Sequence, residues 1–169
     1  MTETREPIKI MFVCLGNICR SPLAEGVFKE KVKKRGLESY FEIHSSGTGN
    51  WHVGKGADTR MVGTAKRRGV SLDSHVAQQF AANDFESYDL ILVMDKSNLH
   101  DVLYLDDDNE WGDRVKLFRE FDPEPEDYQV PDPYYGGPEG FDHVYEIVDR
   151  TSDRLLGSLV AHFDLPVEA

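Results

Sequence analysis

Residues 9–22, with the sequence KIMFVCLGNICRSP, decide the fold, because they lead from a strand-like run through a short loop into a helix. The apolar run at residues 9–13 favours a β-strand, and the Ser-Pro pair that closes the stretch is typical of a first helical turn, where proline is tolerated. The residues between Cys14 and Arg20 must therefore curl and turn several backbone N–H groups toward one point. The dipole of the following helix favours negative charge at that point, so the loop is suited to hold an oxyanion.

The side chains at the two ends of this loop are those of a nucleophile and an anion clamp. A cysteine beside a helix N-terminus and an arginine ionises readily, so we expect Cys14 to act as a thiolate. The planar guanidinium of Arg20 can grip two phosphate oxygens at once, which a lysine cannot do. Ser21 can offer a hydroxyl to the sulfur of Cys14, easing the departure of that sulfur as a leaving group, and it can also cap the helix; the two roles are compatible.

The cysteine also has a plainer interpretation, because most free cysteines are small buried hydrophobic residues. The spacing from Cys14 to Arg20 alone gives the two interpretations equal weight. The strand before the loop and the helix start after it favour chemistry, since structural context is what supports a motif. Gly16 and Asn17 fit the same picture, because so tight a loop needs a residue that tolerates a left-handed backbone.

The rest of the chain alternates between apolar, β-rich runs and segments with helical spacing, which indicates an α/β domain with a parallel sheet. The expected strands are residues 8–13, 40–44, 90–94 and 115–118, and the expected helices are residues 23–35, 59–68, 98–105 and 141–163. We expect a Rossmann-like sheet of four strands in the flavodoxin-type order 2-1-3-4, flanked by helices on both faces. At 169 residues the chain has the size of one domain, which we expect to span residues 1–169.

Composition argues against several classes of partner. The formal net charge of −12 and the isoelectric point near 4.8 disfavour a nucleic acid or an anionic membrane surface, since both require a basic face. Residues 1–6 carry charges of both signs, and the apolar run after them is too short for a signal peptide or a membrane span. We therefore expect a cytoplasmic protein without membrane insertion. The six histidines show no metal-ligand spacing, so we expect neither a metal nor another cofactor.

A second motif, Asp132-Pro133-Tyr134-Tyr135-Gly136-Gly137, lies far downstream of the first. Together with Cys-x5-Arg-Ser near the N-terminus, it makes the chain resemble the low-molecular-weight protein tyrosine phosphatases over nearly its whole length. The resemblance implies hydrolysis of phosphotyrosine through a phosphocysteine intermediate on Cys14, with Arg20 binding the phosphate. One carboxyl group must protonate the leaving group and then deprotonate water, and the resemblance assigns this task to Asp132.

The same resemblance implies roles for further residues. The loop residues would bind the phosphate and the aromatic residues would line the cleft for the ring of the substrate: Leu15, Gly16, Asn17, Ile18, Cys19, Trp51, Tyr134 and Tyr135. The resemblance also implies that Ser45 and His75 hold Asn17 by hydrogen bonds, and that Asp58 and Asp95 support the loop and its entrance. As partners we expect phosphotyrosine-containing proteins, inorganic phosphate or other oxyanions, and a tyrosine kinase that acts on Tyr134 or Tyr135.

Three alternatives stay open. A phosphoarginine phosphatase is the nearest, but Ile18 favours tyrosine, because family members that act on phosphoarginine carry a threonine at that loop position. An arsenate reductase needs further cysteines for a disulfide relay, whereas this chain has only Cys14 and Cys19. The third is a redox-sensing or phosphate-binding module in which these two cysteines form a reversible disulfide. In an enzyme the same pair would protect Cys14 from irreversible oxidation, or Cys19 would simply pack beneath the loop.

Overall fold

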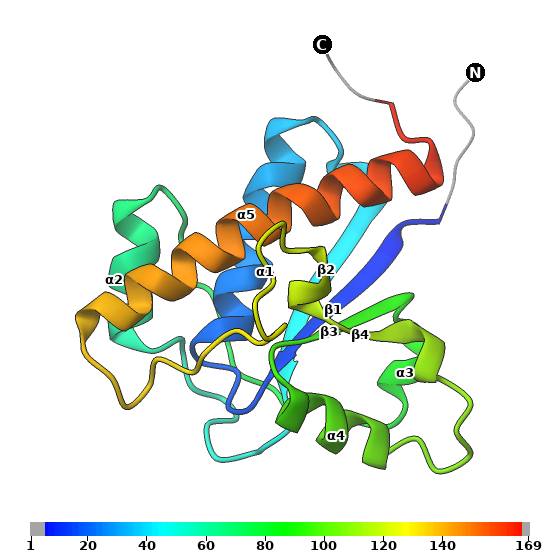
Figure 1. Ribbon diagram of the computed structural model, residues 1–169, viewed down its shortest axis with the longest axis horizontal. Coiled ribbons are helices and arrows are strands. Elements are labelled where there is room, and N and C mark those ends of the chain that lie inside the picture. The colour runs from blue at the N-terminus through cyan, green and yellow to red at the C-terminus, as the bar shows by residue number, and fades with distance from the viewer. Residues whose placement is uncertain (1–5, 167–169) are drawn as a thin grey trace.

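The computed structural model describes residues 6–166 and shows a parallel sheet with helices packed around it (Figure 1). Four strands form this sheet in the order β2-β1-β3-β4: β1 (Ile8–Cys14), β2 (Phe41–Gly47), β3 (Leu90–Val93) and β4 (Val115–Leu117). Each neighbouring pair of strands runs parallel. The predicted α/β class and the strand order 2-1-3-4 are therefore confirmed. The charged segment 1–6, apart from Glu6, lies outside the described residues.

Helices connect the strands, and short 3-10 turns fill the remaining junctions. The α-helices within residues 6–166 are α1 (Arg20–Lys34), α2 (Thr59–Arg67), α3 (Asp84–Ser87), α4 (Lys96–Tyr104) and α5 (Pro138–Phe163), and the 3-10 turns are η1 (Glu38–Tyr40), η2 (Gly112–Arg114) and η3 (Phe118–Phe121). Every predicted helix is present, with ends displaced by at most three residues. The sequence analysis missed α3, because one helical turn is too short to show a period of 3.6 residues.

The alternating side chains of β1 contribute a core to each face of the sheet. Ile8, Ile10 and Phe12 belong to the larger core, which also contains buried residues of α1, α2 and α5. Met11 and Val13 belong to the smaller core, together with buried residues of α3 and α4. Helices therefore cover both faces, as predicted (Figure 1). A strand that is buried on both sides reads as an unbroken apolar run, which is how β1 appears in the sequence.

The carboxyl ends of the parallel strands meet at one edge of the sheet, which is the usual place for a ligand site in an α/β protein. β1 ends at Cys14 and β2 ends at Gly47, and these two residues are paired in register. Residues 122–137, here called the proline-rich segment, run between η3 and α5 past the same edge. The segment is tied to the end of β3 by a hydrogen bond of 2.8 Å from the N–H of Val130 to the carbonyl of Met94.

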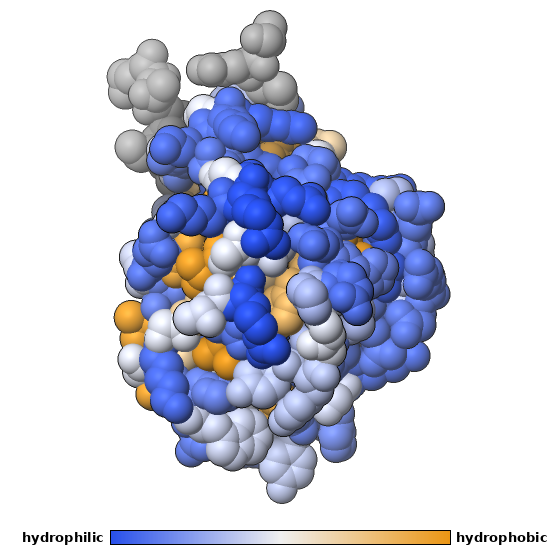
Figure 2. All heavy atoms as spheres, turned by 90° about the vertical axis from the view of Figure 1, so that its left-hand side faces the viewer, coloured by the Kyte–Doolittle hydropathy of each residue, from blue (hydrophilic) through white to orange (hydrophobic). Residues whose placement is uncertain are grey.

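The outer surface is mostly polar. Figure 2 shows one face in which hydrophilic side chains separate several smaller apolar areas from one another. No helix within residues 6–166 has the length and apolar character needed to cross a bilayer. A few large apolar or aromatic side chains are exposed, and Leu15, Trp51 and Tyr135 are among them. These three are residues that the sequence analysis assigns to the site.

Candidate active site

The cysteine loop, residues 14–20, carries β1 directly into α1. Cys14 is the last residue of the strand and Arg20 is the first residue of the helix. Between them Asn17 has a left-handed backbone, with a φ of 58°, as expected for so tight a loop. The N-cap of α1 is Cys19, whose side chain makes no capping hydrogen bond. The N–H groups of the first helical turn thus receive no side-chain cap, which suits them to an anionic ligand.

Asn17 is fully buried, and hydrogen bonds hold both polar atoms of its side chain. Its Nδ2 donates to Ser21 Oγ at 2.8 Å and to Ser45 Oγ at 3.0 Å. Its Oδ1 accepts from the backbone N–H of Gln78 at 2.9 Å, and its carbonyl oxygen lies 2.7 Å from His75 Nε2. The structure therefore brings Ser45 and His75 to Asn17 and adds Gln78, which the sequence analysis missed. These bonds offset the energetic cost of the left-handed conformation.

Ser21 lies beside the sulfur of Cys14. Its Oγ is 3.0 Å from Cys14 Sγ and 3.2 Å from the carbonyl oxygen of Ser46, and it accepts the hydrogen bond from Asn17. A hydroxyl has one proton to donate, so this proton can go either to the sulfur or to the carbonyl. The expected capping role of Ser21 is wrong, because Cys19 is the N-cap and Ser21 lies inside the first turn of α1.

Arg20 is a buried cation whose direction is fixed by acceptors around it, and its side chain is 3% exposed. Its Nη1 donates to Asp95 Oδ2 at 2.7 Å and to the carbonyl of Val130 at 3.0 Å. Its Nη2 lies 3.6 Å from Asp132 Oδ2. Burial alone lowers the pKa of Arg20, but the opposite charge of Cys14 and the hydrogen bond to Asp95 outweigh burial and raise that pKa above its ordinary value. The guanidinium therefore stays charged.

Asp132 lies at the entrance of the site and is far more accessible than Arg20, with 37% of its side chain exposed. Its Oδ1 accepts a hydrogen bond of 3.1 Å from the backbone N–H of Tyr134. Its other oxygen is the one that lies nearest to Arg20. A carboxyl group placed between a buried cation and the solvent can exchange a proton with a bound molecule and with water.

Cys14, Arg20 and Asp132 share one cavity of about 390 Å³. The cavity is lined by residues of the cysteine loop, of the loop after β2 and of the proline-rich segment: Cys14, Leu15, Gly16, Ile18, Cys19, Arg20, Trp51, His52, Asp132, Tyr134 and Tyr135. Trp51 and Tyr135 are exposed, whereas Tyr134 is half-buried, with its ring centroid 4.9 Å from that of Tyr135. A cavity with a thiol, a cation and aromatic rings in its lining is suited to an aryl phosphate.

Two residues depart from the sequence analysis. Asn17 does not line the cavity, because its side chain is directed to the buried side of the loop, toward Ser21 and Ser45. Its side chain is thus part of the scaffold of the loop and not of the cavity wall. His52 lines the cavity, and its ring centroid is 6.3 Å from that of Tyr134. A single histidine in a glycine-rich stretch gives no signal from which this position could be predicted.

Cys19 lines the cavity as well, and both cysteines are buried free thiols. Burial raises the pKa of Cys19, and the negative charges of Asp58 and Cys14 act in the same direction. Cys19 is therefore a neutral thiol at neutral pH. Asp58 supports the loop from the other side, because its N–H donates to the carbonyl of Ile18 at 2.8 Å while its side chain caps α2. A hydrogen bond from the Arg60 side chain lowers the pKa of Asp58, although burial opposes this.

Backbone groups complete the site, and no sequence pattern predicts which of them are used. The carbonyl of Val130 accepts from Arg20, and the N–H of Gln78 donates to Asn17. Any residue type supplies such a group, so only the fold shows which one is used. Within residues 6–166 no cluster of three or more His, Cys, Asp or Glu side chains could hold a metal ion.

Comparisons with known proteins agree over the whole site. A family model described as low molecular weight phosphotyrosine protein phosphatase matches residues 9–164. A protein of that name from Schizosaccharomyces pombe is 43% identical over 152 residues, which cover 88% of this chain and 95% of the relative. The structure of YfkJ from Bacillus subtilis has a TM-score of 0.89 at 31% identity, and the match covers 95% of this chain and 99% of that one.

A further solved structure extends the range of relatives. A Drosophila arginine phosphatase has a TM-score of 0.83 at 30% identity, covering 90% of this chain and 98% of that chain. Family model, curated relatives and solved structures thus match the same region, which contains both the cysteine loop and Asp132. The chain belongs to the low molecular weight phosphotyrosine protein phosphatase family and is a phosphatase enzyme.

Proposed function

We propose that the protein hydrolyses phosphotyrosine in proteins, and aryl phosphates in general, with Cys14 as nucleophile, Arg20 as phosphate-binding cation and Asp132 as general acid and base. The supporting observation is that Asp132, more than a hundred residues downstream of Cys14 and Arg20, lines the same cavity of about 390 Å³ as these two side chains. The names of the family model and of the yeast relative support phosphotyrosine as the substrate class. In this proposal the whole chain works as one catalytic domain.

In the first step the Cys14 thiolate attacks phosphorus, a sulfur–phosphorus bond forms and the bond from phosphorus to the tyrosine oxygen breaks. Arg20 and the N–H groups of the cysteine loop bind the phosphate oxygens as their negative charge redistributes. Asp132 gives its proton to the departing tyrosine oxygen, because a phenol leaves more readily than a phenolate. The hydroxyl of Ser21, 3.0 Å from the sulfur, donates to the thiolate and holds it in place.

In the second step water attacks the phosphocysteine, and Asp132, now ionised, accepts a proton from that water. The sulfur–phosphorus bond breaks, inorganic phosphate forms and Cys14 leaves as a thiolate. Ser21 eases this departure, since its hydroxyl hydrogen bonds most strongly to the charged sulfur. Because phosphate is the product of the reaction, it and similar oxyanions are expected to inhibit by occupying the same loop.

The depth and the walls of the cavity favour a ring over a short alkyl chain. The cavity is lined by a buried thiol, that of Cys14, and by three more accessible aromatic side chains, those of Trp51, Tyr134 and Tyr135. A phosphotyrosine can bring its phosphate to the sulfur while its ring contacts these aromatic side chains. Phosphoserine, which is shorter and lacks a ring, is expected to be a poorer substrate.

Cys19 is proposed to act as a resolving thiol. Mild peroxide would oxidise the Cys14 thiolate to a sulfenic acid, and Cys19 would then displace water from it to give a disulfide that thiols reduce again. Mass spectrometry of the treated protein is expected to find this disulfide, with a Cys19→Ser variant as control. Sulfinic or sulfonic acid on Cys14 as the sole product in the wild type would contradict the proposal.

A tyrosine kinase acting on Tyr134 or Tyr135 is proposed as a further partner. Tyr135 is 93% exposed and is the more accessible of the two rings. Incubation with a tyrosine kinase is therefore expected to label Tyr135 first. A Tyr135→Phe variant that takes up as much label as the wild type would count against this order.

The proposed function is tested with a panel of phosphotyrosine, phosphoserine and phosphoarginine peptides, together with small aryl phosphates. The wild type should hydrolyse the phosphotyrosine peptides and the aryl phosphates, and Cys14→Ser should reduce each rate by roughly 10⁴-fold or more. Trapping of a phosphorylated protein after rapid acid quench would identify the intermediate. A wild type that leaves the phosphotyrosine peptides intact would overturn the assignment of substrate.

Phosphoarginine hydrolysis is the second candidate, because a Drosophila arginine phosphatase shares the fold at 30% identity. Ile18 lines the cavity of this chain, where a threonine would offer a polar contact. The Ile18→Thr variant should gain activity on phosphoarginine relative to phosphotyrosine. A wild type that already prefers phosphoarginine would replace the first proposal by this one.

A further inference from the structure

We propose that Arg119 is a positioning residue, which sets the course of the proline-rich segment so that the carbonyl of Val130 meets Arg20 and the side chain of Asp132 reaches the cavity. This inference rests on the proposed function, since it concerns the delivery of the proposed general acid. Arg119 itself does not line the catalytic cavity. Its role would be exerted through the segment that it holds.

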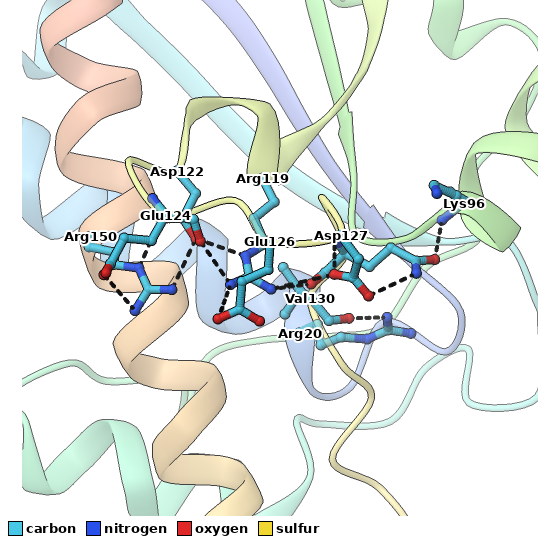
Figure 3. A network of polar contacts seen from close by, with 10 residues as sticks. Arg20, Lys96, Arg119, Asp122, Glu124, Glu126, Asp127, Val130 and Arg150 are labelled. Atoms are coloured by element: carbon cyan, nitrogen blue, oxygen red, sulfur yellow. Dashed lines mark hydrogen bonds and ion pairs between the residues drawn. The ribbon is translucent and has the colours of Figure 1, made fainter.

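Arg119 contacts the proline-rich segment through two main-chain carbonyls and through longer ion pairs with the side chains of Glu126 and Asp127 (Figure 3). Its Nη1 donates to the carbonyl of Gln129 at 2.7 Å, and its Nη2 donates to the carbonyl of Glu124 at 3.1 Å. The side chain is only 2% exposed. One planar group thus joins two points of the segment from inside the protein, which only the forked donors of an arginine can do.

A buried cation needs a counter-charge, and Asp122 provides it. Arg119 Nε donates to Asp122 Oδ2 at 2.8 Å, and Arg150 of α5 donates to Oδ1 of the same carboxylate at 2.8 Å. Burial raises the pKa of Asp122, but the hydrogen bonds from Arg150 and Arg119 outweigh burial and lower that pKa below its usual value. The carboxylate therefore stays ionised and fastens Arg119 to the long helix (Figure 3).

The path from this anchor to the site is short. Gln129, whose carbonyl Arg119 holds, is followed by Val130, whose N–H bonds to Met94 and whose carbonyl accepts from Arg20. The side chain of Gln129 accepts from the N–H of Lys96 at 3.1 Å, which fixes it to the start of α4. Asp132 follows within two residues of Val130. A displacement of Gln129 would therefore move both the carbonyl that contacts Arg20 and the side chain of Asp132.

The segment needs such an anchor because its own hydrogen bonds close only single turns, such as the one from the N–H of Tyr128 to the carbonyl of Pro125. No helix or strand lies between η3 and α5. Glu126 and Tyr128 are non-glycine residues in the left-handed region, with φ values of 49° and 64°. Conformations of this kind persist only where surrounding contacts impose them. Arg119 supplies two such contacts, one on each side of these residues.

The test compares Arg119→Lys with Arg114→Lys. A lysine keeps the positive charge beside Asp122 but cannot reach both carbonyls of the segment at once. Arg114 is a matched control, because its Nη1 also holds two carbonyls, those of Phe85 and Tyr88, outside the catalytic cavity. Both variants alter the arginine that contacts two main-chain carbonyls, but only Arg119 contacts the main chain next to Val130.

The measured quantity is kcat/KM for phenyl phosphate, whose leaving group needs a proton, and for 4-nitrophenyl phosphate, whose leaving group needs one much less. Arg119→Lys is expected to lower the first by about 10-fold or more and the second by a smaller factor. Arg114→Lys should leave the ratio of the two unchanged. Equal losses on both substrates in Arg119→Lys, after correction for the folded fraction, would mean that Arg119 does not position the acid and would overturn the inference.

Asp132→Ala separates this inference from the function on which it depends. If Asp132→Ala lowers kcat/KM for the two substrates by the same factor, Asp132 is not the general acid. If Asp132→Ala lowers kcat/KM more for phenyl phosphate and Arg119→Lys does not, only the inference about Arg119 is wrong. In the double variant the leaving-group effect of Arg119→Lys should vanish, because both changes act through the same carboxyl group.

A second variant decides the matter if Arg119→Lys does not fold. Arg150→Gln removes the hydrogen bonds by which α5 holds the Asp122 carboxylate, and through it Arg119, but leaves Arg119 and Asp122 in place. It is expected to show the same selective loss on phenyl phosphate, at smaller size. An Arg150→Gln variant with the wild-type ratio of the two substrates would then overturn the inference.

Discussion

The cysteine loop and the proline-rich segment line the same cavity, but they are held in place in different ways. The loop is short, continuous in sequence and fixed by the strand and helix at its ends. The proline-rich segment is longer and has no regular structure, and the side chains of Arg119 in η3 and Arg150 in α5 hold it in place. The two regions show that a site can combine one half whose ends are set by a strand and a helix with another half that has no regular structure and is held by individual hydrogen bonds and ion pairs.

The difference in burial follows from the chemistry of each half. Arg20 and the thiol of Cys14 are buried, which shields the proposed nucleophile and cation from water. Asp132 is more than a third exposed, which a group that must collect and release protons requires. A rigid nucleophile and an accessible acid are thus built from different kinds of backbone.

Asp132→Ala should cause the largest selective loss, because it removes the proposed acid and leaves the cysteine loop intact. We expect a fall of about 10²–10⁴-fold in kcat/KM for substrates with poor leaving groups, and a smaller fall for activated ones. Steady-state rates on a series of aryl phosphates will measure it. A variant as fast as the wild type on phenyl phosphate would show that Asp132 is not the general acid, and the difference in burial between Asp132 and Arg20 would then have no catalytic meaning.

Arg20→Lys should affect the cysteine loop in turn. A lysine keeps the charge but loses the fork that contacts Asp95, Val130 and the bound phosphate together. We expect a loss of about 10²–10³-fold in kcat/KM that is similar for good and poor leaving groups. The inhibition constant of inorganic phosphate should rise in parallel. An Arg20→Lys variant with the wild-type inhibition constant for phosphate would contradict the proposal that the Arg20 guanidinium binds the phosphate.

Asn17 allows the local support of the loop to be measured as stability. Asn17→Gly keeps a residue that tolerates the left-handed backbone but deletes the side-chain hydrogen bonds, so the free energy of unfolding should fall by about 2 kcal/mol. Asn17→Ala should cost about 1 kcal/mol more, since alanine is strained at a φ of 58°. Urea unfolding will compare the two. Equal stabilities would show that the loop relaxes its conformation.

The smallest effect concerns the anchor of the proline-rich segment in acid. The pKa of Asp122 is lower in the folded protein than in the unfolded chain, so its contribution is complete above the ordinary aspartate pKa and is lost as the pH falls through the folded value. Arg150→Gln removes one cause of that lowering, so the contribution of Asp122 should be smaller and should be fully lost at a higher pH. Urea midpoints between pH 3 and pH 7 will measure the shift, with Arg154→Gln on the same helix as control.

The fold and the cysteine loop could be predicted from the sequence, because local residue patterns indicate both. The apolar run of β1, the glycine and asparagine of the loop and the Ser-Pro helix start determine the first half of the site between them. The strand order and the helices on both faces are confirmed by the topology. The assigned roles of Cys14, Arg20 and Asp132 stay predictions.

The remaining features could not be predicted, because they depend on backbone groups or on single residues without a pattern. The carbonyl of Val130 and the N–H of Gln78 are available at any residue type. His52 enters the cavity only because its loop folds over the end of β1. Ser21 was expected to have a capping role as well, but the helix begins at Arg20, ahead of it. Tertiary contacts decided each of these cases.

The pairing of Arg20 with Asp95 and Asp132 has an electrostatic consequence for the encounter with substrate. Two carboxylates already offset much of the field of that guanidinium, and the chain as a whole carries a formal charge of −12. A dianionic ester therefore meets repulsion at long range and attraction only over the last few ångströms. Raising the ionic strength from 0.01 M to 0.15 M shortens the Debye length from about 30 Å to about 8 Å. Moderate salt should accordingly quicken the capture of substrate, the reverse of what electrostatic steering gives.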